Sequence, residues 1–194
     1  MADPFWLSTK VTVDDYRRME ERKDGQAIAD FIHRRLHERY IAPVHVVPPD
    51  EKNGFLIMAV SCLLVETLES FWQGWESTEP TKKSPGKSKL AFREFFKRQW
   101  RFLAFRDHAD GFYRHVRCGI LHQGETTGGW RIRRNGRLFD EDDLIINATA
   151  FHQRLSGALG DYRDNLYDAD WNSERWGNVR TKMAAVLKHC EKPK

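Results

Sequence analysis

The stretch FLIMAVSCLLVETLESFWQGWE, residues 55–76, is the most apolar part of the chain, and the predicted fold is built around it. Its first half is hydrophobic on all sides, which is typical of a helix buried at the centre of a protein. The continuous apolar run, residues 55–65, covers only about half of a membrane span. We therefore expect residues 55–76 to form a central core helix, and we expect no membrane association.

One stripe of this helix is less apolar than the rest. Helical spacing places four side chains on a common face: Cys62, Glu66, Glu69 and Gln73. Such a stripe either belongs to a site or faces solvent. Its composition favours a solvent-facing stripe that begins where the helix leaves the core.

The whole chain has the composition of one globular domain. It has 194 residues, of which 40% are hydrophobic and 31% charged, and its net charge is +4. This weakly basic balance is compatible with a polyanionic partner but does not by itself indicate one. The three cysteines suggest no disulfide framework, and the N-terminus lacks the pattern of a signal peptide. The sequence therefore predicts a cytoplasmic protein.

Apolar residues at helical spacing predict further helices on both sides of the central one. Residues 25–40 form one of them. Residues 42–54 predict an extended linker or an isolated edge strand, and residues 77–89 a polar loop. Residues 90–105 predict a helix with an aromatic inner face that includes Trp100 and Leu103. Its outer face is basic, with Arg93, Lys97, Arg98 and Arg101. This mixture can bind nucleic acid, although a buried aromatic face beside a solvated basic face is more common.

The second half of the chain predicts a helix over residues 110–123, a β-hairpin over about 130–139 and two more helices. The hairpin follows from alternating apolar residues around Asn135-Gly136, a type I′ turn sequence. A long helix is expected over 142–166, capped by Asp142 or Asp143, and a C-terminal helix begins near Trp176. The predicted fold class is thus an all-α bundle with one inserted hairpin.

An unusual polar cluster lies in FYRHVRCGILHQGET, residues 112–126. Its residue types leave several roles open. His115, Cys118 and His122 could bind a metal, although a structural site needs four ligands. Cys118 could act as a nucleophile. Arg117 could stabilise a phosphate-centred transition state with His122 as general acid or base. Structural hydrogen bonds from Arg117 and His122 to the following loop are the simplest alternative, and residue types alone favour it.

The sequence RCGILH, residues 117–122, resembles the signature of the HEPN superfamily, in which an arginine precedes a histidine by several residues near the end of a helix. The wider stretches FYRHVRCGILHQGETTGGWRI and ETLESF are also similar to those of bacterial HEPN-like proteins. The resemblance covers residues 25–167. It implies a HEPN-like helical domain there, with residues 1–24 as an N-terminal extension and residues 168–194 as a C-terminal helix packed on it.

The resemblance also implies a function. Many HEPN proteins are dimeric, metal-independent endoribonucleases of toxin–antitoxin or phage-defence systems, without cofactors. Others have lost catalysis and bind RNA or a protein partner. On this chain Arg117 and His122 would be the catalytic pair, and Glu66 or Glu69 would orient one of them. Cys118 stands where active members commonly have Asn, Asp or His, which favours the non-catalytic alternative. RNA contacts would come from Arg114, His115 and Gln123.

Overall fold

The computed structural model describes residues 5–45, 51–82 and 85–190, and most of them are helical. The α-helices are α1 (Val13–Glu21), α2 (Gly25–Leu36), α3 (Ala42–His45), α4 (Gly54–Gln73), α5 (Ser88–Arg98), α6 (Ala109–Gly111), α7 (Cys118–Gln123), α8 (Ala148–Tyr167) and α9 (Glu174–Cys190). Two π-helical segments, η1 (His37–Ile41) and η3 (Phe112–Arg117), and a 3₁₀-helix, η2 (Trp100–Phe105), join some of them. Three short strands are β1 (Arg131–Arg133), β2 (Phe139–Asp140) and β3 (Ile145–Asn147). The mainly helical prediction is confirmed.

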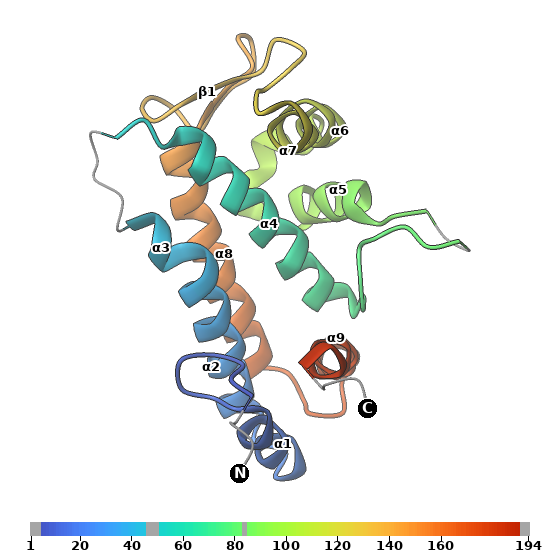
Figure 1. Cartoon of the computed structure of the whole chain (residues 1–194). Helices are drawn as coiled ribbons and strands as arrows, with labels where there is room; N and C mark the ends of the chain where they lie inside the picture. Colours follow the sequence, from blue (N-terminus) through green and yellow to red (C-terminus); the bar gives the residue numbers. More distant parts are fainter. Residues whose placement is uncertain (1–4, 46–50, 83–84, 191–194) are drawn as a thin grey trace.

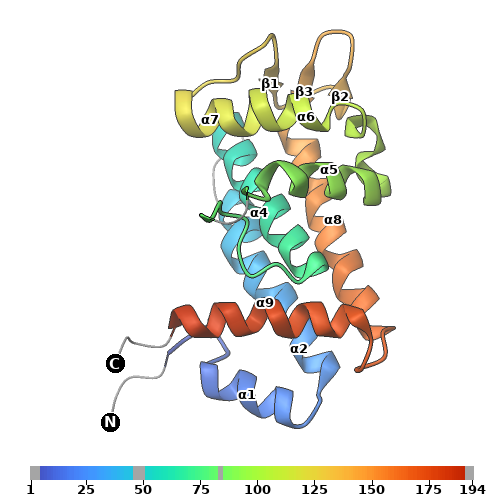
Figure 2. The same ribbon diagram turned by 90° about the vertical axis from the view of Figure 1, so that its right-hand side faces the viewer.

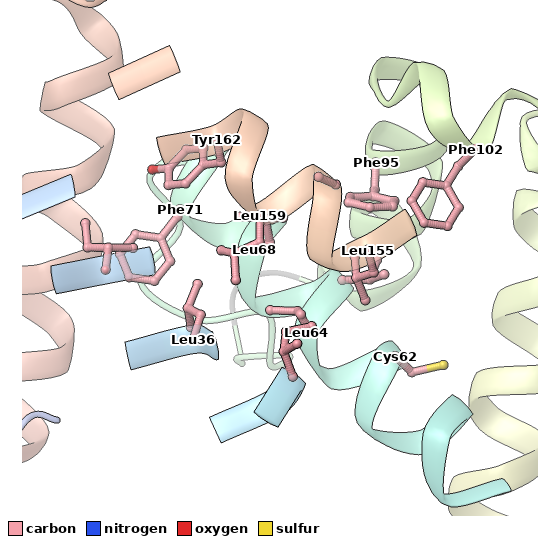
Figure 3. Packing of buried hydrophobic residues seen from close by; sticks show 14 of the residues in the cluster. Leu36, Cys62, Leu64, Leu68, Phe71, Phe95, Phe102, Leu155, Leu159 and Tyr162 are labelled. Atoms are coloured by element: carbon pink, nitrogen blue, oxygen red, sulfur yellow. The ribbon is translucent and has the colours of Figure 1, made fainter. Parts of the chain in front are cut away.

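Helix α4 is the centre of the bundle, as predicted. It packs against α8, α5 and α9, while α2 lies along α8 (Figure 1). In Figure 3, Leu64 and Leu68 of α4 lie close to Leu155 and Leu159 of α8, and Phe71 lies near Tyr162. By length and composition α4 could span a membrane, but 67% of its most apolar window is buried inside the protein. Its environment is therefore that of a core helix.

The two ends of the bundle are closed by different elements. The small sheet lies at one end beside the helix formed by α6, η3 and α7, and α9 crosses the other end, next to α1 (Figure 2). Helix α9 caps the C-terminus of α4: Asn178 Nδ2 donates to the carbonyl of Trp72 (2.8 Å), and Lys182 Nζ donates to that of Glu76 (2.9 Å). Gly74 allows this contact, because it has φ +65° and a Cβ there would lie 2.9 Å from the Asn178 Cα atom.

The N-terminal segment contributes to the same core. Thr12 caps α1 in a capping box with Asp15, in which each side chain accepts a hydrogen bond from the other residue's backbone N–H. Leu7 and Tyr16 are fully buried, and the Tyr16 ring lies 5.7 Å from that of Phe31 on α2. From the C-terminal segment, Trp176 of α9 is 1% exposed and packs against Gly25 at the start of α2. Both flanking segments thus share the hydrophobic core of the central domain.

Two predictions about helix ends are wrong. The helix of residues 25–40 continues through η1 into α3, so residues 42–45 of the expected linker are helical, and residues 46–50 lie outside the described part. The helix expected over 90–105 ends at Arg98, and η2 follows with a different period. As a result Trp100 and Leu103 are 64% and 49% exposed, whereas they were predicted to face inward.

The β-hairpin prediction is also wrong, although strands do form near both of its expected arms. β1 pairs with β3 in parallel and β2 pairs with β3 antiparallel, giving the order β1-β3-β2, so β1 and β2 are not neighbours. A type I′ turn needs positive φ at both central residues, and of Asn135 and Gly136 only Gly136 has it. The central strand comes from residues predicted to start a helix.

Asn147 explains where that helix begins. Its side-chain oxygen accepts a hydrogen bond from the backbone N–H of Ala150 (3.0 Å), so Asn147 caps α8 in place of Asp142 or Asp143. Its Nδ2 group donates to the carbonyl of Gly136 (2.7 Å), which ties the loop between β1 and β2 to the end of β3. One buried side chain therefore ends the central strand, starts α8 and fixes the loop.

A buried histidine makes the stability of the fold depend on pH. His152 of α8 is 2% exposed, and its Nδ1 atom is hydrogen-bonded to the Ser61 hydroxyl of α4 (3.0 Å). Burial lowers the pKa of His152 from 6.5 to about 4; the Ile41 backbone opposes this shift and His45 adds to it. The folded protein therefore keeps His152 neutral at a pH where the unfolded chain takes up a proton.

We expect His152 to lower the free energy of unfolding as the pH falls. Between pH 6.5 and about 4 the unfolded state binds the extra proton, so the free energy of unfolding should fall by up to about 3 kcal/mol across this window. Urea unfolding at several pH values measures this. The difference between wild type and His152→Asn should show the pH dependence, and the exposed His189→Ala variant should not alter it. A flat difference curve would contradict the assignment.

Candidate functional site

The polar cluster lies on one continuous helix built from α6, η3 and α7, residues 109–123. Phe112 and Val116 anchor it in the core with no exposed surface. Its middle is π-helical, so the backbone N–H of Cys118 donates to the carbonyl of Tyr113, five residues earlier. It ends at Gly124, which adopts φ +66°. π-helical segments are uncommon and are often found at functional sites.

Arg117 faces α4 and pairs with Glu66. The Nε atom of Arg117 donates to Glu66 Oε1 (2.7 Å), and the two side chains are 18% and 10% exposed. Thr78 also donates to the other oxygen of Glu66 (3.4 Å). Burial lowers the pKa of Arg117, but the hydrogen bond and charge of Glu66 more than offset this and raise it. Arg117 is thus a charged group held in one orientation.

The surroundings of this pair contain an aromatic ring and two thiols. The Arg117 guanidinium lies over the Tyr113 ring, 5.8 Å from its centroid. Burial raises the pKa of Tyr113, and a hydrogen-bond contact with Cys118 adds to the effect. Burial, together with Glu66, strongly raises the pKa of Cys62, whose sulfur points away from Leu64 and Leu155 in Figure 3. Cys62 therefore remains a neutral thiol beside the ion pair.

A pocket of about 210 Å³ opens next to Arg117, between α4 and α7. Its walls are mainly apolar, and Arg117 contributes a charged side chain to them. The residues that line it are Ala59, Cys62, Leu63, Arg117, Ile120 and Leu121. At its rim Leu63 and Leu121 are 52% and 58% exposed. A fixed guanidinium in a mostly apolar pocket can bind an anionic group with little competition from water.

His122 is placed differently from Arg117. It is exposed in the last turn of α7, and five residues on a regular helix turn its side chain roughly 140° from that of Arg117. Within the described parts of the chain, no hydrogen bond or ion pair joins the two side chains. A single chain therefore presents the arginine and the histidine in different directions.

The remaining candidates of this helix are scattered. His115 Nδ1 is hydrogen-bonded to the Thr127 hydroxyl (3.0 Å), and its ring packs so closely on Gly128 that a Cβ there would lie 2.5 Å from Nδ1. Arg114 and Gln123 are exposed. His115 therefore supports the loop after the helix, whereas Arg114 and Gln123 are open to solvent.

Glu69 does not join the Arg117 site. It is fully buried and pairs with Arg98 of α5, whose Nη1 donates to Glu69 Oε1 (3.0 Å), and Gln73 Nε2 donates to the same oxygen (2.9 Å). The Arg98 guanidinium also lies 4.6 Å from the centroid of the Trp72 ring. The expectation of a solvent-facing stripe is thus wrong, because Cys62, Glu66 and Glu69 are buried and both carboxylates are ion-paired.

Sequence reasoning missed several groups at the site. Tyr113 precedes Arg117 by one helical turn, and this spacing could have suggested the contact. Thr78 and the apolar rim formed by Leu63 and Leu121 carry no comparable signal, because they depend on how the loop and α7 pack on α4. Among the described residues, no group of three His, Cys, Asp and Glu side chains is placed to hold a metal ion.

Comparison of the chain with protein-family models, curated proteins and solved structures finds no match in any of the three.

Proposed function

We propose that the protein is a HEPN-type, metal-independent endoribonuclease of a toxin or defence system, acting in the cytoplasm as a homodimer. The observation that carries the proposal is the Glu66–Arg117 ion pair at an apolar pocket. The pair holds the guanidinium through Nε, and among the described residues its Nη groups have no hydrogen-bond or ion-pair partner, so they can bind a phosphate. The mainly helical fold is compatible with a HEPN domain over residues 25–167.

The chemistry of such a site needs no cofactor. The 2′-hydroxyl of RNA attacks the adjacent phosphorus while the bond from phosphorus to the 5′-oxygen breaks, leaving a 2′,3′-cyclic phosphate and a 5′-hydroxyl. Arg117 would stabilise the negative charge that develops on the phosphoryl oxygens. His122 would take the proton of the 2′-hydroxyl or give one to the leaving oxygen. The His122 side chains of two protomers could divide these tasks.

A dimer could bring the Arg117 side chain of one protomer close to the His122 side chain of the other. An exposed apolar surface surrounds the pocket: it consists of Leu56, Ala59 and Leu63, which share one stripe of α4, together with Leu121 of α7. Exposed apolar patches of this kind mark interaction sites. A second copy docked on this surface would bring its own α7 beside Arg117, so that one cleft could contain residues of both protomers.

The dimer gives a direct prediction. Wild type should have about twice the 22.8 kDa mass of one chain in solution, and Leu121→Asp should be a monomer because the new carboxylate would lose its hydration at the interface. Light scattering after size-exclusion chromatography measures both masses. Leu90→Asp, at a 40% exposed leucine of α5, is the matched control and should stay dimeric. A monomeric wild type would overturn this part of the proposal.

Catalysis is tested by expression in bacteria. Wild type should arrest growth and degrade cellular RNA, and His122→Ala should relieve the arrest because the proton-transfer group is lost. His189→Ala removes another exposed histidine, on α9, and should be as toxic as wild type. If all three strains grow alike, with equal protein levels and intact RNA, the nuclease proposal fails.

The second candidate is a non-catalytic HEPN module that binds RNA or a protein partner such as an antitoxin. Two observations favour it. His122 points away from Arg117 within a protomer, and Cys118 lies against Tyr113, at the position where active family members commonly have Asn, Asp or His. Such a module would bind its ligand at the Arg117 pocket and leave RNA uncut.

A further inference from the structure

The pocket beside Arg117 lies between two helix faces. Side chains three and four residues apart share one face of a helix, and each wall of the pocket is a set of this kind. The walls consist of residues 59, 62 and 63 of α4 and of residues 117, 120 and 121 at the end of η3 and in α7. Because the rim leucines Leu63 and Leu121 are half exposed, the space between the two faces is open to solvent on that side.

Few polar groups line this pocket. Four of the six lining side chains are alanine, leucine or isoleucine, and the other two are Cys62 and Arg117. Burial raises the pKa of the Cys62 thiol, so Cys62 is neutral and offers only a weak hydrogen-bond donor. Among the described residues, no hydroxyl, amide or carboxylate side chain belongs to the lining. A ligand is therefore recognised here by its shape and by one negative charge.

Arg117 is oriented so that part of its guanidinium remains available to such a ligand. Glu66 accepts a hydrogen bond from Nε (2.7 Å) and does not line the pocket. The Nη groups have no hydrogen-bond or ion-pair partner in the described parts of the chain. Guanidinium N–H groups suit the oxygens of a phosphate. The pocket thus combines an apolar space with a phosphate-binding group in its wall.

We infer that this pocket binds one nucleotide of the RNA, with the base between the two helix faces and the adjacent phosphate on the Nη groups of Arg117. The inference rests on the proposed function, in which Arg117 binds a phosphate of RNA. A base that leaves its stack can be held between apolar side chains, because its two faces are apolar and its edges are polar. The aliphatic walls contact the faces, and a polar edge stays in water at the open rim.

The composition of the walls also determines what the pocket does not read. Proteins distinguish bases by hydrogen bonds from polar side chains to the base edges. The lining offers such groups only at Arg117, which holds the phosphate, and weakly at Cys62. The pocket therefore positions a base next to the phosphate without selecting its identity, and cleavage should show no strict base preference.

The test is isothermal titration calorimetry of the full wild-type chain with deoxyuridine 3′,5′-bisphosphate, which has no 2′-hydroxyl and is not cut by the proposed reaction. The comparison ligand is its abasic analogue, in which a tetrahydrofuran replaces the sugar and base. The abasic analogue should bind at least about tenfold more weakly, because it loses the apolar contacts of the base. The corresponding bisphosphates of the other bases should bind within about fivefold of deoxyuridine bisphosphate, since no edge is read.

Cys62→Leu assigns the base to this pocket. The larger side chain fills the space from below the rim, and Cys62 is only 4% exposed, so the apolar surface proposed for dimer formation is unchanged. The variant should bind the two ligands equally, and its affinity for the abasic analogue should be that of wild type because Arg117 is retained. Cys190→Leu makes the same change on α9 and should keep the wild-type difference. Thermal melting and light scattering check folding and mass.

The inference is overturned if deoxyuridine bisphosphate does not bind at about 1 mM, or if the abasic analogue binds within about twofold of it. It is also overturned if Cys62→Leu keeps the difference between the two ligands, or if octanoate, an apolar anion without a base, binds as tightly. Nucleotide binding by a protein that leaves RNA intact would support this inference and contradict only the nuclease proposal. RNA cleavage without nucleotide binding would contradict only this inference.

Discussion

Arg117→Ala should lower the rate of RNA cleavage about 100- to 1,000-fold, the cost of removing one preorganised donor to a developing oxyanion. The loss should appear in kcat more than in KM, since Arg117 would contact the charge that forms in the transition state. Single-turnover cleavage of a labelled RNA by the purified variant measures the rate. Arg117→Lys should recover only part of it, because lysine cannot hold Glu66 and a phosphate with one rigid planar group.

Arg98→Ala is the matched control for this result. Arg98 and Arg117 each pair with a buried carboxylate of α4, Glu69 and Glu66 respectively. Each alanine variant leaves one carboxylate without its partner and should lose stability. Only Arg117→Ala should lose cleavage when both variants are measured below their melting temperatures. Equal losses, or cleavage by Arg117→Ala at the wild-type rate, would contradict the assignment.

Phe96→Ala should destabilise the fold by about 4 kcal/mol, the typical cost of truncating a fully buried phenylalanine. Phe96 has no exposed surface, and its ring lies at the centre of an aromatic cluster with Phe92, Phe95, Phe102, Phe105, Phe112 and Phe151. The cavity would open between α5, η2, η3 and α8. Urea unfolding measures the loss, which should also lower Tm by roughly 10 °C.

Leu103→Ala is the control for Phe96→Ala. It removes a large apolar side chain from the adjoining 3₁₀-helix, but that side chain is 49% exposed, so the loss should be well under 1 kcal/mol. If the two variants lost equal stability, the aromatic cluster would not be the centre of the core.

The sequence predicts the centre of the fold well, because α4 is so apolar that only a position at the centre of the bundle buries its surface. It fails at η2, where the helical period of residues 90–98 was extended through Gln99. The backbone leaves helical geometry at Gln99, with ψ +103°, and again at Phe102, with φ −124° and ψ +20°, so the period of residues 90–98 does not continue. Trp100 and Leu103 were therefore placed on the wrong face.

The sheet could not be predicted from local pattern alone. The apolar run before Asn147 is too short to distinguish a strand from the first turn of a helix. The Asn135-Gly136 pair suggested a hairpin, but the parallel pairing of Arg131 with Ile145 joins residues far apart in the chain. Local turn chemistry contains no information about such a pairing.

The ion pair at Arg117 was anticipated only in part. The family resemblance suggested that Glu66 or Glu69 would orient Arg117 or His122, without deciding between them. Which carboxylate pairs with Arg117 depends on how α7 and α5 pack on α4. Arg117 forms an ion pair with Glu66, and Arg98 forms one with Glu69. The same packing buries a stripe that composition alone assigns to solvent, because the charges that neutralise it come from other helices.

Incubation of the purified protein with a labelled RNA in excess EDTA tests the proposed activity most directly. We expect wild type to cut the RNA and to leave 2′,3′-cyclic phosphate ends, and we expect Arg117→Ala and His122→Ala to leave it intact over the same time. Intact RNA with the folded wild-type dimer, or cleavage that both variants retain, would contradict the proposal that Arg117 and His122 form a ribonuclease site.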